Sequence, residues 1–239
     1  MPQIPSPTDT TVDESIKTEY TENTKQDRYA DYLSVLQELA PQSFEEFATL
    51  QNTDPARMAE LEKQYQVLSQ YKTDSGSLSA NEIWDLDQKT FLEKQKLFTK
   101  RYARSGNIAG AYLDGDLNIL YFAHSQINTE ISLAKGYNGL NQRITLKPTR
   151  RFIYVDVQKS GGWIRGNTYY DTEAKLFEFF ADLYEQKPFR SITMLSERGM
   201  CDSCKGVMEQ FKKQFPDVTV NVVSNKSVEG NVWEWRRRN

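Results

Sequence analysis

Two cysteines lie close together near the C-terminal end of this 239-residue chain. Cys201 and Cys204 are three positions apart, so they would share one face of the first turn of a helix. The partial positive charge of a helix N-terminus lowers the pKa of a nearby thiol and favours the thiolate, which is the form that binds metal ions. Two cysteines in this spacing cannot form the disulfide framework of a secreted fold. The pair therefore predicts half of a zinc site, with a redox-active dithiol as the alternative.

Two carboxylates stand at the start of another segment with helical periodicity. Asp171 could complete the zinc site, because carboxylate oxygens are ordinary zinc ligands. Glu173 follows two positions later, where a carboxylate could move protons during a reaction at the ion. The only histidine of the chain, His124, is an alternative third ligand. The competing interpretation of Asp171 and Glu173 is that they only complement the dipole of a helix N-terminus.

This ligand set has an electrical consequence. Two thiolates and one carboxylate would leave a bound Zn²⁺ with a net negative charge, which weakens its ability to acidify a bound water. A nearby cation could offset that charge, and Arg198 and Lys175 are the candidates.

Hydrophobic periodicity predicts the elements that would hold these residues. We expect helices at 79–102, 171–184 and 201–215, and strands at 107–113, 117–124, 151–157, 191–195 and 218–223. Asp114 and Gly115 predict a hairpin between the first two strands. Residues 72–78 have the composition of a polar linker. The strand–helix–strand unit at the C-terminal end has short connections, which indicates partly parallel strands with right-handed crossovers.

Three stretches of the sequence carry a resemblance to a known family. They are Phe122–Ile127, Asp171–Leu176 and Leu195–Val223, the last of which holds both cysteines. Through them the chain resembles the cytidine-deaminase-like superfamily, and in particular the deaminase domains of bacterial polymorphic toxins, over residues 79–224. The resemblance implies an α/β fold with three α-β-α layers around a mixed sheet of about five strands, preceded by an N-terminal helical segment.

The sequence departs from the zinc-deaminase signature H-x-E…P-C-x-x-C at two positions. Asp171 stands where the signature has His, although some toxin deaminases carry D-x-E. Met200 stands where the signature has Pro, so the rigid turn before Cys201 is lost. The resemblance implies that Asp171, Cys201 and Cys204 bind Zn²⁺.

The resemblance also implies an activity, the zinc-dependent hydrolytic deamination of cytosine to uracil in nucleic acid. Glu173 would carry the protons as general acid and base. We expect His124, Ser125, Trp163 and Arg198 to contact the substrate. Among polymers we favour DNA, and single strands over duplex, because a base leaves the stack of a single strand at lower cost. The alternative is a non-catalytic, zinc-stabilised module that only binds nucleic acid.

Charge is unevenly distributed along the chain. Residues 1–78 carry a net charge of −8 and residues 79–239 one of +5, which together give −3. The basic part favours an anionic partner such as nucleic acid. The stretch Trp233–Arg238 could stack on bases and pair with phosphates, or be a solvated terminus. The resemblance alone adds a second partner, a cognate immunity protein.

We expect three parts along the chain. Residues 1–26 form a disordered tail because they hold few large apolar groups, 27–78 an acidic helical segment, and 79–239 the deaminase-like catalytic domain. No apolar run of about 20 residues and no signal peptide is apparent, so no membrane partner is expected. The expected site of action is cytoplasmic, with delivery into a target cell.

Overall fold

The computed structural model describes residues 56, 68–97, 106–129, 141–158, 164–166 and 168–226. Six strands form one mixed sheet in the order β1-β8-β7-β2-β3-β4. Their bounds are Tyr71–Ser75 (β1), Ile108–Leu113 (β2), Tyr121–His124 (β3), Gln142–Ile144 (β4), Ser191–Ser196 (β7) and Thr219–Asn225 (β8). A separate two-stranded sheet pairs β5 (Val157–Gln158) with β6 (Ile164–Arg165).

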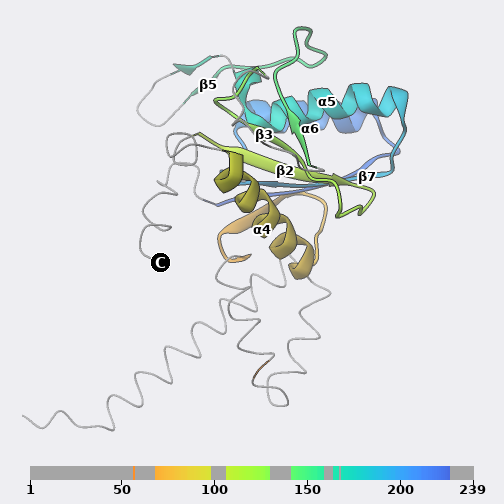
Figure 1. The fold of residues 1–239 in the computed structure, drawn as a ribbon. Coiled ribbons are helices and arrows are strands. Elements are labelled where there is room, and N and C mark those ends of the chain that lie inside the picture. The colour runs from red at the N-terminus through yellow and green to blue at the C-terminus, as the bar shows by residue number, and fades with distance from the viewer. Residues whose placement is uncertain are drawn as a thin grey trace, which may run out of the picture.

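Helices cover both faces of the six-stranded sheet (Figure 1). Helix α4 (Ala80–Leu97) lies on one face, whereas α5 (Thr172–Gln186) and α6 (Asp202–Gln214) lie on the other. Phe177 and Phe211 pack between α5 and α6 with their ring centroids 5.3 Å apart, and both belong to a buried cluster with Met194 and Val222 of the sheet. The predicted three-layer α/β fold is confirmed.

The strand directions bring several segment ends to one edge of the sheet. Strands β7 and β8 run parallel, with Ser191 paired to Thr219 and Ser196 to Ser224, so α6 crosses back between them. Strand β2 runs antiparallel to β7 and begins where β7 ends, and β3 returns beside β2 to end there as well. The end of the sheet at which β7 and β3 finish, which we call this edge, therefore holds the start of α6, the start of β2 and the end of β3.

Local sequence signals produce two of the connections. Ser79 and Glu82 form a capping box at the start of α4, in which Glu82 N–H donates to Ser79 Oγ (3.2 Å) and Ser79 N–H to Glu82 Oε2 (2.8 Å). The β2–β3 hairpin turns at Asp114 (φ 52°) and Gly115 (φ 71°), both in the left-handed region that such turns require. The capping box and the hairpin are confirmed, although the second strand of the hairpin begins at Tyr121 and not at residue 117.

Residues 151–157 do not form the predicted strand. The N–H groups of Arg151 and Phe152 donate instead to the carboxylate of Glu178 on α5, at 2.9–3.1 Å. The side chain of Gln210 on α6 both accepts from Ile153 N–H (3.0 Å) and donates to Ile153 O (2.9 Å). Helix side chains thus supply the hydrogen bonds that a neighbouring strand would supply, and only Val157–Gln158 is a strand.

The predicted linker at 72–78 is also wrong in its first half, because residues 71–75 form β1 at the edge of the main sheet. The main sheet has six strands where about five were expected, because β1 and β4, neither of which was predicted, join it and residues 151–157 do not. The tail at 1–26, most of the segment 27–78 and the stretch Trp233–Arg238 lie outside the described residues, so the domain boundaries stay a prediction. No described helix is both long and apolar enough to cross a membrane.

Candidate metal centre and active site

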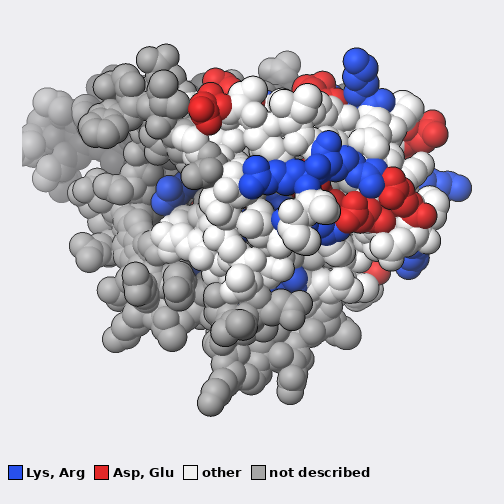
Figure 2. Space-filling view, turned by 90° about the horizontal axis from the view of Figure 1, so that it is seen from above, with Lys and Arg blue, Asp and Glu red and all other residues white. Residues whose placement is uncertain are grey.

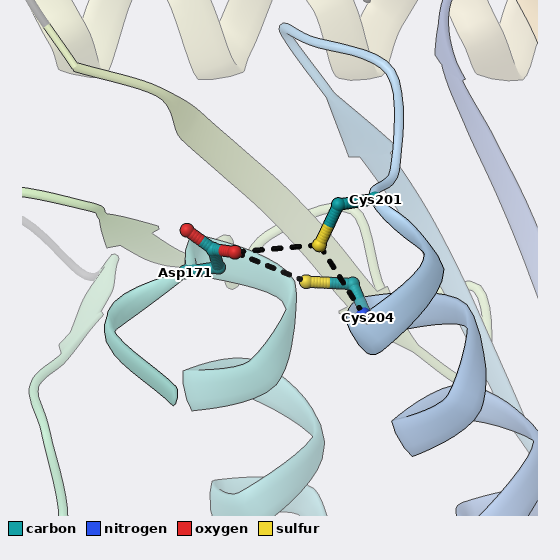
Figure 3. A group of neighbouring side chains, drawn as sticks. All are labelled: Asp171, Cys201 and Cys204. Atoms are coloured by element: carbon teal, nitrogen blue, oxygen red, sulfur yellow. Dashed lines mark hydrogen bonds between the residues drawn. The ribbon is translucent and has the colours of Figure 1, made fainter. Parts of the chain in front are cut away.

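Two helix N-termini face each other at this edge of the sheet (Figure 3). Asp171 is the N-cap residue of α5, and its side chain makes no capping hydrogen bond to its own helix. Cys201 is the N-cap residue of α6, and its sulfur accepts from Cys204 N–H at 3.4 Å. The carboxylate of Asp171 points at both sulfurs, so the first turns of two helices converge on one point.

The three side chains have the spacing of a tetrahedral metal site. Asp171 Oδ2 lies 3.4 Å from Cys201 Sγ and 3.7 Å from Cys204 Sγ, and the ligand atoms all lie within 4.8 Å of one another. Tetrahedral zinc with ordinary bond lengths separates a sulfur and an oxygen ligand by about 3.6 Å. The donor set therefore fits a zinc ion, although it does not by itself identify the metal.

His124 is not part of this group. Among the described residues, the metal-ligand group comprises Asp171, Cys201 and Cys204. His124 is buried, and its Nδ1 accepts from Gln126 N–H at 3.2 Å. Side chains alternate along a strand, so His124 faces away from the side of β3 on which Ala123 joins the core under α5. The alternative of His124 as third ligand is therefore not supported.

Glu173 is buried beside the three metal-ligand residues. Its Oε2 lies 3.5 Å from Cys204 Sγ, and the residue is only 2% exposed. Oε1 accepts from Ser196 Oγ and from Asn107 Nδ2 (3.1 Å), and Oε2 accepts from Thr172 Oγ1 (3.0 Å). Ser196 and Asn107 thus hold Oε1, while Oε2, the oxygen that faces Cys204, accepts from Thr172.

Sequence reasoning missed three of these residues. Asn107 immediately precedes β2, Ser196 ends β7, and Thr172 separates Asp171 from Glu173. Asn107 Nδ2 also donates to Thr172 Oγ1 (2.7 Å) and Ser196 Oγ (3.1 Å), so one amide links three elements. Thr172 lies inside the D-x-E motif, whereas no motif marks Asn107 and Ser196, for which the useful signal would have been their position at strand ends that meet.

The environment shifts the pKa of Glu173 and of both cysteines. Burial raises the pKa of Glu173, and the nearby Asp171 raises it further, while the hydrogen bond from Ser196 opposes both. The hydrogen bond between the two thiols lowers the pKa of Cys201, whereas that bond and burial raise the pKa of Cys204. Metal ions bind the thiolate form, so a bound metal ion would displace the thiol protons of this pair.

Neither predicted compensating cation donates a hydrogen bond to the metal ligands among the contacts described here. Lys175 is buried, and its Nζ donates to the carbonyl oxygens of His124 (2.8 Å) and Ile127 (2.9 Å). Burial lowers the pKa of Lys175 to about 8, and the charges of Asp171 and Glu173 partly offset this. Arg198 lies in the β7–α6 connection, and its buried Nε has no hydrogen-bond partner among the described residues.

The predicted substrate residues are only partly placed by the structure. Ser125 Oγ accepts from Asn107 N–H at 2.9 Å, which puts Ser125 next to the residue that holds Glu173. His124 precedes it at the end of β3, and Arg198 lies on the loop that leads to Cys201. Trp163 lies outside the described residues. Their contact with a substrate stays a prediction.

The three layers, the mixed sheet, and an Asp-Cys-Cys group that could hold a metal ion beside a buried glutamate are the arrangement of an α/β enzyme of the deaminase type. Residues 88–226 match the model of the toxin-deaminase family described as the BURPS668_1122 family of deaminases. The match spans more than half of the chain, so the protein belongs to this family of deaminases. Comparisons with curated proteins and with solved structures give no significant match.

Proposed function

We propose that the protein deaminates cytosine to uracil in nucleic acid, with zinc as its metal and single-stranded DNA as its preferred substrate. One observation carries the proposal: in a chain of a deaminase family, a buried glutamate lies 3.5 Å from a sulfur of a three-residue metal-ligand group. Hydrolytic deamination needs a metal that activates water and a carboxylate that transfers protons. Both requirements fit the residues at this edge of the sheet.

Asp171, Cys201 and Cys204 would hold the zinc ion. When bound, zinc lowers the pKa of a water molecule and so supplies the nucleophile. Glu173 would carry both protons of the attacking water: it accepts one as the oxygen adds to C4 and gives it to the ring nitrogen, and it accepts the second as the C4–oxygen bond becomes a carbonyl and gives it to the amine, which leaves as ammonia. The burial that raises its pKa favours a carboxyl group that can hold a proton between these transfers.

Asn107 and Ser196 would position Glu173 rather than touch the substrate. Both donate to Oε1, and this fixes the rotation of the carboxyl group. Oε2, the oxygen on the side of Cys204, is the one that would face the reacting atoms. Ser125, Arg198 and Trp163 are the proposed substrate contacts around it, whereas the side chain of His124, the fourth predicted contact, faces the other side of the sheet.

A stacked group of side chains beside the metal ligands supports a polymeric substrate. The guanidinium of Arg150 lies 3.2 Å from the ring centre of Tyr169, and the ring centroids of Tyr169 and Tyr170 are 4.2 Å apart with the rings tilted by 43°. We call these three residues the Tyr169 stack. Tyr170 directly precedes Asp171, so this stack ends next to the metal ligands. Aromatic rings that continue into a cationic group are a common surface for the bases and phosphates of single strands.

The surrounding surface carries both signs of charge. Figure 2, which looks onto the face with α5 and α6, shows Lys and Arg side chains gathered in a row with Asp and Glu beside them. Arg151 is paired there with Glu185 (2.6 Å) and Asp182 (3.4 Å). Recognition of nucleic acid by this face would therefore depend more on the Tyr169 stack than on a uniform basic patch.

In keeping with its family, we propose that the protein acts as a bacterial toxin in the cytoplasm of a target cell and is neutralised by an immunity protein.

The direct test is to incubate the protein with single-stranded DNA, duplex DNA, RNA and free cytidine, and to read C-to-U conversion by sequencing and chromatography. We expect conversion that is fastest in single-stranded DNA. Glu173→Gln should lower the rate by about 10²–10⁴-fold while the protein still binds one zinc ion. Full activity of Glu173→Gln would refute the role of Glu173. Binding of nucleic acid without any product would favour the non-catalytic module instead.

A further inference from the structure

The backbone just before the metal ligands is held by a chain of hydrogen bonds that reaches the edge strand β1. Met200 N–H donates to Ser224 Oγ on β8 at 3.3 Å, and Ser224 Oγ in turn donates to Oδ2 of Asp74 on β1. Ser224 is fully buried and Met200 is 2% exposed. Three residues that are far apart in the sequence are thus joined next to Cys201.

The direction of these bonds is set by chemistry. An ionised Asp74 can only accept, so the single proton of the Ser224 hydroxyl must point towards it. The lone pairs of the same oxygen then remain available to Met200 N–H. A substitution at Asp74 would therefore weaken the hydrogen bond of Met200 N–H, because it would change the orientation of the Ser224 hydroxyl group.

The residue type at position 200 explains why these hydrogen bonds are needed. The zinc-deaminase signature has Pro before the first cysteine, and Pro has a restricted φ and no N–H group. Met200 adds a buried N–H that needs a partner, and it removes the restriction that Pro would place on the turn. Ser224 provides the acceptor for the Met200 N–H group. Its hydrogen bond to Asp74 fixes the position of that acceptor, and so restricts the turn where Pro would have restricted it.

We infer that the chain Asp74–Ser224–Met200 is a positioning device for the metal-binding turn, which takes the place of the missing proline. Asp74 lies outside residues 88–226, so an element that precedes the matched part of the chain supports its metal site. The inference concerns the metal centre and does not depend on the identity of the substrate. It assigns β1 a role that no motif of the sequence indicates.

The test compares Ser224→Ala in the wild-type protein with Ser224→Ala in a Met200→Pro protein. Zinc affinity is measured by competition with a chelating dye, and the geometry of the site by the absorption spectrum of the Co²⁺-loaded protein. We expect Ser224→Ala to weaken zinc binding by about 10–100-fold and to shift the cobalt bands, as loss of a group that orients a ligand does elsewhere. With Pro at position 200 there is no N–H to hold, so the same change should alter affinity by no more than about twofold.

A matched control lies on the same pair of strands. Ser75 Oγ donates to Val220 O at 3.1 Å, so Ser75→Ala removes a β1–β8 hydrogen bond that does not lead to the metal ligands. We expect Ser75→Ala to keep the wild-type zinc affinity and cobalt spectrum. If Ser224→Ala does not fold, Asp74→Ala tests the same hydrogen-bond chain from its β1 end. Asp74→Asn keeps an acceptor and should lose less zinc affinity than Asp74→Ala.

Two results would overturn the inference. One is wild-type zinc affinity and an unchanged cobalt spectrum in both Ser224→Ala and Asp74→Ala. The other is an equal loss of affinity from Ser224→Ala with Met and with Pro at position 200. Neither readout measures deamination, so the inference can fail while the proposed function stands, and the reverse also holds.

Discussion

Glu173 is an acidic side chain that is almost wholly enclosed by protein, and this enclosure has a cost as well as a use. It is 2% exposed, and burial raises its pKa above the ordinary value of a glutamate. The hydrogen bonds from Ser196, Asn107 and Thr172 recover only part of the hydration that its charged form loses. The carboxyl group that we propose as the proton carrier is thus buried at the expense of folding stability, as is common in active sites.

The stability of the metal-free protein should reveal this cost through its pH dependence. Because the folded-state pKa of Glu173 is raised, the folded state binds more protons than the unfolded state between the two pKa values, and the free energy of unfolding falls as pH rises through this window. We expect Glu173→Gln to be more stable than wild type at pH 7, by about 1.4 kcal/mol for each unit of pKa difference, and equally stable near pH 4.

Urea unfolding between pH 4 and pH 8 in the presence of a chelator measures this difference. The substitution keeps an acceptor for Ser196 and Asn107, because both donate to the same oxygen of Glu173. Thr172 Oγ1 can turn to accept from the new amide. A stability difference that does not change with pH would show that burial of the charged carboxylate is not its cause.

At the scale of the elements, short side-chain links take the place of regular secondary structure around the site. The 3-10 helix Thr168–Tyr170 (η2) is held against the start of α6, because Thr168 Oγ1 lies 2.8 Å from Ser203 Oγ. Val155 N–H donates to the same Ser203 hydroxyl at 3.2 Å. Ser203 lies between the two cysteines, so the residue inside the C-x-x-C motif also fixes the segment that carries the Tyr169 stack.

This arrangement predicts that Tyr170 contacts the nucleotide beside the target base. Arg150 and Tyr170 pack against the ring of Tyr169, which leaves Tyr170 as the end of the stack on the side of Asp171. Stacking of one base on an aromatic ring is worth about 1–3 kcal/mol, so Tyr170→Ala should raise KM for a single-stranded oligonucleotide by about 5–150-fold. KM for free cytidine should stay unchanged.

Steady-state kinetics with both substrates provide the measurement, and Tyr170→Phe is the control because it keeps the ring. We expect Tyr170→Phe to resemble wild type on the oligonucleotide. If Tyr170→Ala raises KM for cytidine by the same factor, Tyr170 shapes the metal site rather than the path of the strand.

At the scale of the whole molecule, the metal-ligand group joins the starts of two helices that come from different parts of the chain. Asp171 starts α5, whereas Cys201 and Cys204 lie at the start of α6, and strand β7 runs between the two helices in the sequence. A ligand that binds only the folded state stabilises it according to its concentration and affinity. Zinc should therefore act as a structural link between α5 and α6 in addition to any catalytic role.

We expect zinc at a free concentration of 1,000 times its Kd to stabilise the protein by about 4 kcal/mol, which raises Tm by about 8–16 °C. Asp171→Ala should lose most of this dependence on zinc. Asp171→His should retain it, because the Nδ1 atom of His lies as many bonds from Cα as a carboxylate oxygen of Asp. Thermal unfolding across a zinc titration measures the effect, and a wild-type Tm that does not respond to zinc would contradict it.

The sequence by itself determined what depends on neighbours along the chain. The spacing of Cys201 and Cys204 placed them on one helical turn, the capping box at Ser79 started α4, and Asp114 and Gly115 formed the hairpin. These features follow from backbone geometry over two to four residues, and tertiary contacts change them little. The family resemblance extended this local reading to the layered fold and to Asp171 as the third ligand.

Only the tertiary structure decided which distant residues meet. It chose Asp171 over His124 beside the sulfurs, because alternation along β3 turns His124 to the other side of the sheet. It brought Asn107 and Ser196 to Glu173, and it placed β1 against β8 where a linker was predicted. Each of these outcomes depends on strand order and register, and a hydrophobic pattern specifies which face of an element is buried but not which element it is buried against.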